Sequence, residues 1–331
     1  TAAVLHSRRE LAALDHAEAR DKIRWFSFLA GGLAVYLFYR AWSMAPVDAL
    51  PARIEFSIRA LVTAVSMGLA LLMWLVFGFI PWYQARKRMK ELDRWTAGDV
   101  EAAVPVLRFE TWLEMQKAPA TRFLLGLIAL VGVAQLMPGN SIPAAGLMKD
   151  PAHRDWWRLL TSPLMHGNLL HFMMNAAALV YLGRRIEVIA GWPHVFMVFL
   201  FSAWIGGECS LRFVGLPSVG ASGGLMGWLG FLMIFESLHG RLVPVKARRR
   251  LLAGILLTGL IGLVGFRFID NAAHLGGLVA GLLYALIVFP KSASAARPLP
   301  TWSDRIAGVL AAMVLIFATT IAMWKILGAL R

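Results

Sequence analysis

Ser222 stands among closely spaced glycines at the start of an apolar segment, in the stretch LPSVGASGGLMGWLG from Leu216 to Gly230. Each glycine inside a helix costs about 0.5–1 kcal/mol relative to alanine, so this segment has a weak helical start. A serine hydroxyl is a poor nucleophile until an adjacent base, usually an imidazole, takes its proton. The stretch is consistent with acyl transfer at Ser222, or with a hydroxyl bonded back to its own helix among glycines that serve packing alone.

Two histidines and an asparagine also fall in apolar segments. His274 lies in DNAAHLGGLVAG, and His171 and Asn175 lie four residues apart in MHGNLLHFMMNAAALVYLG. Polar groups inside a bilayer are costly and tend to mark function. His274 is the candidate base, with an interhelical donor or a proton relay as the other interpretations. His171 and Asn175 share one helix face, where they could join helices or, with the N–H groups at the start of the Ser222 helix, stabilise an oxyanion.

Small residues at three- and four-residue spacing allow membrane helices to approach closely. The Ser222 and His274 segments both carry such a face, made of Gly220, Gly223, Gly224 and Gly227 on the first and Gly276, Gly277 and Gly281 on the second. We therefore expect these two helices to pack together, with the hydroxyl and the imidazole as neighbours. Asp270 lies one turn before His274 but at the loop end, so a dyad is predicted rather than a triad.

The composition indicates a membrane protein. Of the 331 residues, 59% are hydrophobic and 16% are charged, whereas soluble domains have about 45–50% and about 25%. Apolar windows of roughly 18 residues, long enough to cross a bilayer, recur along the chain. An all-α, polytopic fold is predicted, and the composition strongly disfavours the alternative of a soluble helical enzyme. The nine expected spans are 25–44, 60–82, 121–138, 168–183, 192–209, 220–238, 251–266, 271–289 and 306–327.

The basic residues predict the orientation of these spans. With the N-terminus in the cytoplasm, most of the 33 lysines and arginines fall in connections on the inner side, and the C-terminus lies outside. The net charge of +14 is scattered over separate loops, which favours a topological role and attraction to anionic lipid over nucleic-acid binding.

This orientation places the polar residues at one depth. Ser222 lies 16 residues before Leu238 at the inner flank, and His274 lies 16 residues before Pro290. Both are therefore about 24 Å above the inner edge, and His171 is about 20 Å above it. The predicted site lies in the outer third of the membrane.

Three regions are predicted along the chain. Residues 1–118 hold two spans and a polar segment over 84–118, expected to be an interfacial or cytosolic helix that is either a plain connector or a regulatory element. Residues 119–290 hold six spans, and residues 291–331 hold a linker and a last span. No metal or other cofactor is expected, and the single cysteine, Cys209, allows no intrachain disulfide.

Several ordered motifs resemble those of the rhomboid family of intramembrane serine proteases, over roughly residues 119–290. WWRLLTSPLMHGNLLHFMMN resembles the family's Trp-Arg loop followed by its His-x-x-x-Asn helix. GASGG resembles the Gly-x-Ser-Gly nucleophile motif, and AAHLGGLVAG resembles the Ala-His-x-x-Gly helix. Met226 departs from some bacterial relatives, which carry an aromatic residue there. The two N-terminal spans and the C-terminal span exceed the six-span core.

The resemblance implies a role for each matched residue. Ser222 would be the nucleophile and His274 its base, while His171, Asn175 and the Ser222 backbone N–H would stabilise the oxyanion. The outer-leaflet loop would contain Trp157 and Arg158 and be braced by His166.

The resulting hypothesis is a cofactor-independent serine endopeptidase in the bacterial inner membrane, with its site on the outer side. Its partners would be the lipid bilayer and transmembrane protein substrates whose helices unwind locally near the outer interface. One alternative is a non-catalytic rhomboid-like protein that binds or escorts membrane segments. The other is a transporter or channel, for which the expected internal repeat is not evident.

Overall fold

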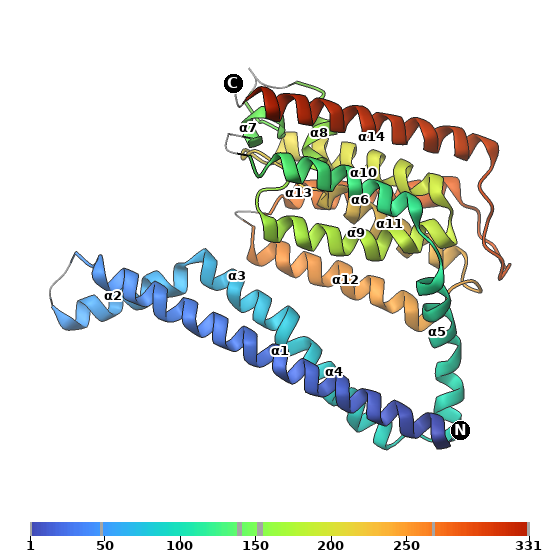
Figure 1. Ribbon diagram of the computed structural model, residues 1–331, viewed down its shortest axis with the longest axis horizontal. Coiled ribbons are helices and arrows are strands. Elements are labelled where there is room, and N and C mark those ends of the chain that lie inside the picture. The colour runs from blue at the N-terminus through green and yellow to red at the C-terminus, as the bar shows by residue number, and fades with distance from the viewer. Residues whose placement is uncertain (1, 47–48, 138–140, 151–154, 267–268, 330–331) are drawn as a thin grey trace. The chain divides into compact units, whose positions relative to one another are not determined.

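The computed structural model describes residues 2–46, 49–137, 141–150, 155–266 and 269–329 (Figure 1). Over these ranges the chain is helical without a β-strand, and a single antiparallel bridge joins Leu147 to Ser218. The all-α prediction is confirmed. The longer helices are α1 (Ala2–Ser43), α2 (Leu50–Thr63), α3 (Val65–Met73), α4 (Ile80–Asp93), α5 (Ala97–Met115), α6 (Pro119–Ala134), α9 (Leu169–Ile189), α10 (Trp192–Phe213), α11 (Ser222–Leu238), α12 (Val245–Val264), α13 (Asn271–Val288) and α14 (Trp302–Gly328).

Several of these helices are suited to crossing a membrane. In the described residues, four stretches are long and apolar enough, namely Ser66–Asp93, Trp192–Phe213, Asn271–Val288 and Trp302–Gly328. A fifth results if the bent pair Arg108–Met115 and Pro119–Ala134 is one span, and Ser222–Leu238 and Leu251–Val264 are shorter apolar helices. The chain is an integral, multi-pass membrane protein. The nine-span count and the orientation remain predictions.

The chain divides into two compact units. One contains Thr1–Pro105 with Leu263–Arg267, and the other contains Val106–Gly262 with Phe268–Arg331. This division falls inside α5, whereas the three regions predicted from the sequence follow the membrane spans. The three-region division remains a prediction.

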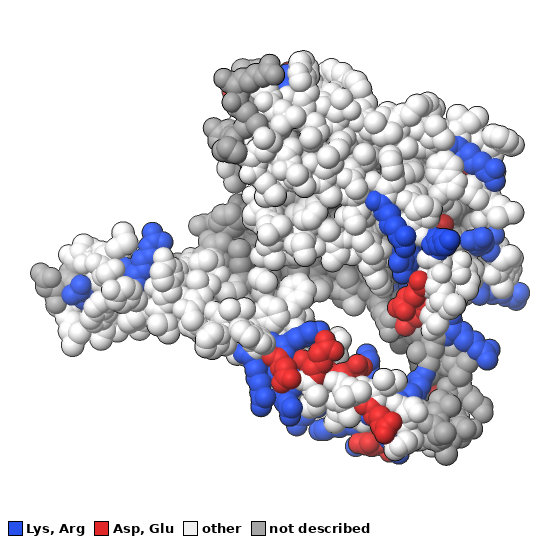
Figure 2. Space-filling model, in the orientation of Figure 1, with Lys and Arg blue, Asp and Glu red and all other residues white. Residues whose placement is uncertain are grey.

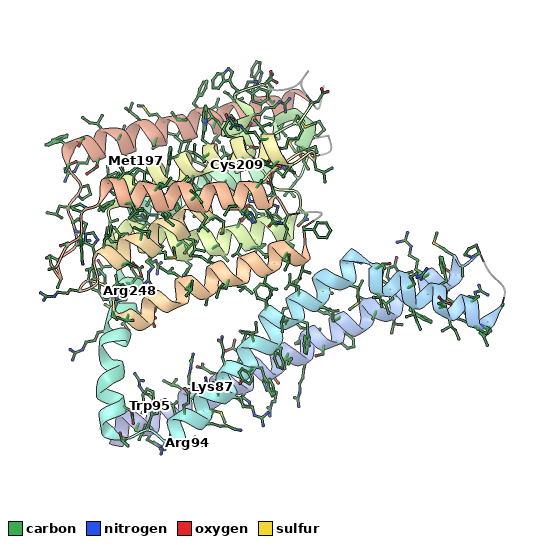
Figure 3. All side chains as sticks on the ribbon, turned by 180° about the vertical axis from the view of Figure 1, so that it is seen from behind. Lys87, Arg94, Trp95, Met197, Cys209 and Arg248 are labelled. Atoms are coloured by element: carbon green, nitrogen blue, oxygen red, sulfur yellow. The ribbon has the colours of Figure 1, made fainter. Side chains whose placement is uncertain are left out.

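The first unit is built on α1, which packs along α2, α3 and α4 and along the π-helix η1 (Trp74–Phe79). The Trp74 indole donates to the Ser27 hydroxyl at 2.8 Å, and the Arg9 guanidinium donates to the Leu92 carbonyl at 3.1 Å. Charged side chains gather on α4 and on the N-terminal half of α1 (Figure 2). Lys87, Arg94 and Trp95 lie in the same part of this unit (Figure 3).

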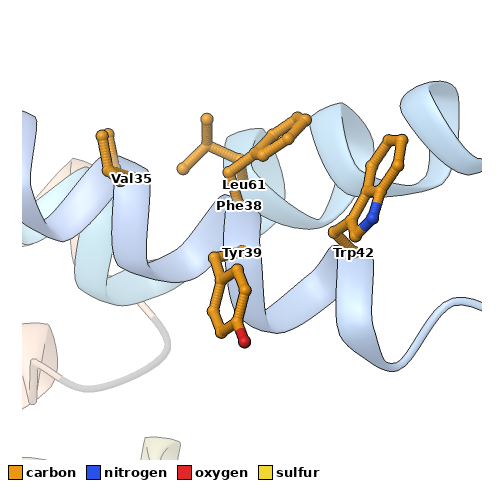
Figure 4. A pocket seen from close by; sticks show the side chains of 6 residues that line it. Val35, Phe38, Tyr39, Trp42 and Leu61 are labelled. Carbon is orange, nitrogen blue, oxygen red and sulfur yellow. The ribbon is translucent and has the colours of Figure 1, made fainter.

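The predicted span 60–82 is not one continuous α-helix. Ala64 has an extended backbone, with φ −67° and ψ 118°, between α2 and α3. Val62, Thr63 and Val65 flank this position, and β-branched residues lower helix propensity. Near the break, α1 and α2 border an open apolar hollow of about 590 Å³ lined by Val35, Phe38, Tyr39, Trp42, Ala34 and Leu61 (Figure 4).

In the second unit, α11 and α13 form the most extensive helix pair, and α10 packs against both. α9, α6 and α14 complete the bundle. The start of α6 is held by the buried Glu187 carboxylate, which accepts hydrogen bonds from the backbone N–H groups of Ala120 at 2.9 Å and Thr121 at 2.8 Å. A carboxylate at a helix N-terminus satisfies free N–H groups and favours the helix dipole. This contact joins α6 to α9.

α14 starts with a capping box, in which Thr301 and Asp304 satisfy each other's backbone N–H groups. The helix then packs along α10 and α6. Gly308 allows close approach, because a Cβ there would come within 2.6 Å of the Pro193 side chain. The helix of the third predicted region is therefore part of the same bundle as α6 to α13.

Candidate active site

Ser222 is the first residue of α11 and is partly buried. The N–H groups of a first helical turn have no partner within the helix, so its hydroxyl lies beside free donors and the positive end of the dipole. Gly220 leads into this turn with φ +130°, a conformation that side-chain-bearing residues rarely adopt. Its N–H donates to the Ser162 carbonyl at 3.0 Å. The glycine at 220 is thus required by the backbone turn that presents Ser222.

His171 and Asn175 lie against this turn. Both are on α9, whose N-cap Asn168 accepts a hydrogen bond from the His171 backbone N–H at 2.9 Å. A Cβ at Gly220 would come within 2.9 Å of His171 Nε2 and 3.6 Å of Asn175 Nδ2. The structure therefore brings both predicted side chains to the residue two positions before Ser222.

Asn175 carries a donor available for a ligand. Its side chain is 7% exposed, and Nδ2 has no hydrogen-bond partner among the described residues. A buried polar group without a partner is costly, and such groups in native structures deserve a functional explanation.

His274 lies in the first turns of α13 and is partly buried. α13 meets α11 backbone to backbone, because a Cβ at Gly277 would overlap the Gly223 carbonyl oxygen. One at Gly223 would lie 3.5 Å from the carbonyl oxygen of Ala273. The residue after Ser222 thus contacts the residue before His274, so the predicted pair is at the same level of the bundle.

The Ser222 hydroxyl and the His274 ring are not hydrogen-bonded to each other, although both residues are described. Catalytic hydrogen bonds are often long in a free enzyme and tighten only when substrate binds. The structure therefore brings the backbones next to Ser222 and His274 into contact, and the pairing of the two side chains remains a prediction.

The predicted packing glycines serve three different contacts. Gly277 and Gly281 each lie against the α11 backbone, at the carbonyls of Gly223 and Gly227. Gly224 faces α10 instead, where a Cβ would come 2.6 Å from the Phe199 ring. Gly276 also faces α10, where a Cβ would come 2.7 Å from Cys209 Sγ, and Figure 3 shows Cys209 on that helix. Gly220 faces the side chains of α9.

Arg158 organises the loop beside the site. Its buried guanidinium donates to the carbonyls of Pro143 at 2.9 Å and Gly146 at 2.8 Å, and it pairs with Asp155 at 3.1 Å. Its Cζ also lies 4.5 Å from the centre of the Trp157 ring. Arg158 therefore holds the loop through two of its backbone carbonyl groups.

His166 connects the loop to α9. Its ring lies edge-on to those of His171, at 5.2 Å between centroids, and Phe172, at 5.3 Å. Its backbone N–H donates to Gln135 Oε1 at 2.9 Å, and its carbonyl accepts from Gln135 Nε2 at 3.0 Å. Within the described part of the chain, neither ring nitrogen has a partner. His166 therefore lies next to His171, and its role as a brace of the loop remains a prediction.

Sequence reasoning did not identify a polar cluster close to these residues. Asp270, Ser210, Ser218 and Lys149 are joined by hydrogen bonds. The available signal was the Asp-Asn pair before an apolar run, because aspartate is a favoured N-cap residue. Asp270 indeed caps α13 by accepting from the Ala273 N–H at 2.9 Å.

Comparison with known proteins agrees with the motifs. The Rhomboid domain family matches residues 153–291. Rhomboid protease GlpG of Photorhabdus laumondii is 30% identical over 202 residues, which are 58% of this chain and 70% of the relative. Rhomboid protease GluP of Bacillus subtilis is 33% identical over 146 residues, 43% of this chain and 28% of the relative. RHOMBOID-like protein 6, mitochondrial, of Arabidopsis thaliana is 31% identical over 163 residues, 45% and 53% of the two chains.

The chain belongs to the rhomboid family. The chain spans about half or less of the length of GluP and RHOMBOID-like protein 6.

Proposed function

We propose that this protein is a serine endopeptidase that cleaves transmembrane segments of other membrane proteins. Two of the relatives are named rhomboid proteases, which supports an intramembrane hydrolase. Ser222 is the nucleophile and His274 is its general base. The N-terminus lies in the cytoplasm of a bacterial cell, and cleavage takes place near the outer face of the inner membrane.

The reaction follows acyl transfer through a serine ester. Ser222 Oγ attacks the carbonyl carbon of the scissile peptide as His274 takes the hydroxyl proton. The tetrahedral oxyanion accepts hydrogen bonds from the Ser222 backbone N–H, Asn175 Nδ2 and His171. His274 then gives its proton to the leaving amine, which frees the first product.

A water molecule completes the cycle. His274 takes a proton from this water, which attacks the ester carbonyl carbon. The second tetrahedral intermediate uses the same donors, and its collapse releases a carboxylic acid and restores the Ser222 hydroxyl.

The substrate must expose an extended backbone. A membrane helix shields its peptide groups and already satisfies their hydrogen bonds, so the cleaved segment has to unwind locally. We therefore expect small or helix-weakening residues near the outer interface of substrates.

One observation carries the proposal. His171 and Asn175 converge on Gly220, two residues before Ser222, and Asn175 offers a buried donor that has no partner in the ranges the structure describes. A helix contact formed only for packing does not require an unsatisfied amide at this point, because burying it unpaired is unfavourable.

A fluorophosphonate probe tests the proposal on the detergent-solubilised full chain. We expect labelling of the wild type that is lost in Ser222→Ala and falls steeply in His274→Ala. Ser237→Ala is the matched control, because this serine is exposed on the same helix and its hydroxyl donates to the Met233 carbonyl of its own helix. Folded wild type that is neither labelled nor able to cleave a panel of transmembrane segments would instead favour a protein that escorts membrane segments.

A further inference from the structure

Asp270 is the centre of a polar cluster formed by four segments of the second unit. Its Oδ2 accepts hydrogen bonds from the hydroxyls of Ser210 and Ser218, and these hydroxyls lie 3.0 Å apart. Ser210 Oγ also accepts a hydrogen bond from Lys149 Nζ. We call these four residues, Lys149, Ser210, Ser218 and Asp270, the Asp270 cluster.

The cluster joins the segments that carry the proposed dyad. Ser218 is four residues before Ser222, and Asp270 is four residues before His274. Ser210 is fully buried near the end of α10, the helix that packs against both α11 and α13. One carboxylate thus bonds directly to the chain leading to the nucleophile and to the first turn of the helix that carries the base.

The two carboxylate oxygens have separate roles. Oδ1 caps α13 through the Ala273 N–H, the residue directly before His274. Helix capping needs only this oxygen. Oδ2 makes both serine contacts, which add nothing to the cap. The second oxygen therefore serves to connect α13 to the neighbouring segments.

A backbone contact places Ser218 independently of its side chain. The Leu147 N–H donates to the Ser218 carbonyl at 3.0 Å, and the Ser218 N–H donates to the Leu147 carbonyl at 3.0 Å. The segment before Ser222 is therefore already fixed against the loop at this residue. Its hydroxyl takes no part in this backbone contact and donates to Asp270.

We propose that Asp270 is a positioning residue, whose Oδ2 contacts to Ser210 and Ser218 hold the first turn of α13 so that His274 faces Ser222. This inference rests on the proposed function, because it assigns a purpose to the relative position of the dyad residues. Small errors in such positions are costly, since a displacement of about 1 Å can reduce a rate about 100-fold.

The variant Asp270→Ser separates positioning from capping. Serine is about as good an N-cap as aspartate, so the α13 cap remains, but its single short hydroxyl cannot also hold two serines. We expect a modestly lower thermal midpoint, because the Ser210 and Ser218 hydroxyls lose their acceptor. The KM should stay within about twofold of wild type, and kcat should fall between about tenfold and 100-fold. Ser210→Ala with Ser218→Ala should give a similar kcat, and adding Asp270→Ser to this pair should cause little further loss, because coupled residues are not additive.

Ser237→Ala is again the control and should leave kcat unchanged. A kcat of Asp270→Ser equal to wild type would reduce Asp270 to a helix cap and overturn the proposal. Fully additive losses of kcat in the triple variant would overturn it as well, because they would show that the serines and Asp270 affect kcat independently.

Amide hydrogen exchange tests the same connection without activity. We expect faster exchange over residues 216–222 and 271–275 in the Ser210→Ala, Ser218→Ala variant, with α14 unchanged. If the fluorophosphonate probe fails to label the wild type but exchange rises in both segments, the proposed function fails while the connection through Asp270 stands. Exchange that is unchanged in both segments would contradict the connection, whatever the activity.

Discussion

α9 and α11 meet at two places that differ in chemistry. At the Ser222 end, His171 and Asn175 lie against Gly220, and Asn175 Nδ2 has no partner among the residues described. At the Glu236 end, the Arg185 guanidinium binds both oxygens of the Glu236 carboxylate, one of them at 3.0 Å. The same two helices therefore share one polar contact with an unpaired donor, the open contact, and one in which the two charged groups pair with each other, the closed contact.

The closed contact has the features of a structural pair. Arg185 and Glu236 have side chains that are 2% and 0% exposed, and the Phe109 ring lies 5.3 Å from the Arg185 guanidinium. Arg248 adds a hydrogen bond to the Glu236 carbonyl at 3.4 Å. Buried charges persist when they are paired and hydrogen-bonded in this way. The two contacts are both buried, but they differ in hydrogen bonding: Arg185 and Glu236 satisfy each other, whereas Asn175 Nδ2 has no partner in the described part of the chain.

The largest expected effect is on catalysis at the Ser222 end. His274→Ala should lower kcat/KM by about 10⁴-fold or more without changing the thermal midpoint, because the base acts only in the reaction. The double variant Ser222→Ala, His274→Ala should be no slower than either single variant, since residues of one catalytic unit are not additive. Cleavage assays of a transmembrane substrate in detergent measure this, with His6→Ala as the control. Multiplicative losses would show that the two residues act separately.

The next effect is on stability at the Glu236 end. Arg185→Met leaves a buried carboxylate without its partner and should lower the free energy of unfolding by about 3–5 kcal/mol. Replacing both residues, as Arg185→Met with Glu236→Leu, should restore most of this loss, because no unpaired charge remains. Denaturant titration in detergent measures both variants.

A single Arg185→Met variant as stable as wild type would contradict the structural role of the pair. We expect the double variant to retain wild-type cleavage per folded molecule, because the pair serves stability whereas the residues at the Ser222 end serve catalysis.

Asn175→Ala should lower activity without lowering stability, the opposite of what is expected for Arg185→Met. The loss of an oxyanion donor is expected to lower kcat by about 10²–10³-fold. Stability should stay the same or rise, because the substitution removes a buried donor that lacks a partner in the described structure. Measuring kcat and the thermal midpoint on the same preparation tests this. A clear loss of stability with normal kcat would make Asn175 a residue that joins helices.

The smallest effect is expected at the loop beside the site. Lys325 Nζ of α14 lies 5.2 Å from the centre of the Trp157 ring, on which the Arg158 guanidinium also packs. Lys325→Met should cost about 0.5–1 kcal/mol, the usual size of an exposed cation–π contact, and Lys325→Arg should cost less. Thermal unfolding distinguishes the two variants. A loss of several kcal/mol would mean that the loop depends on α14 more than on Arg158.

Candidate site residues could be chosen from the sequence more readily than the contacts that these residues make. Ser222, His274, His171 and Asn175 stand out as polar groups in apolar segments, and they fall on the starts of α11, α13 and α9. Glycine spacing predicted close helix packing but could not indicate the neighbour, so Gly224 faces α10 although its spacing resembles that of Gly223. Glycine spacing shows where a helix surface is small, but it does not show which neighbouring helix that surface contacts.

Contacts between residues far apart in the chain could not be predicted from the sequence for a similar reason. Ser210 and Asp270 are 60 residues apart, and Arg185 and Glu236 are 51 apart. Each residue alone resembles an ordinary helix-end or flanking polar group, and only the folded bundle brings the partners together. The break at Ala64 was missed because hydropathy stays high through it, although the β-branched residues around it were a signal.

The most direct measurement is a high-resolution structure of the full chain with a fluorophosphonate bound covalently. We expect phosphorus on Ser222 Oγ, His274 within hydrogen-bonding distance of the adduct, and a phosphoryl oxygen about 2.7–3.1 Å from Asn175 Nδ2 and the Ser222 backbone N–H. An adduct on another residue, or one whose oxygen points away from Asn175 while His274 lies out of reach, would contradict the proposed active site.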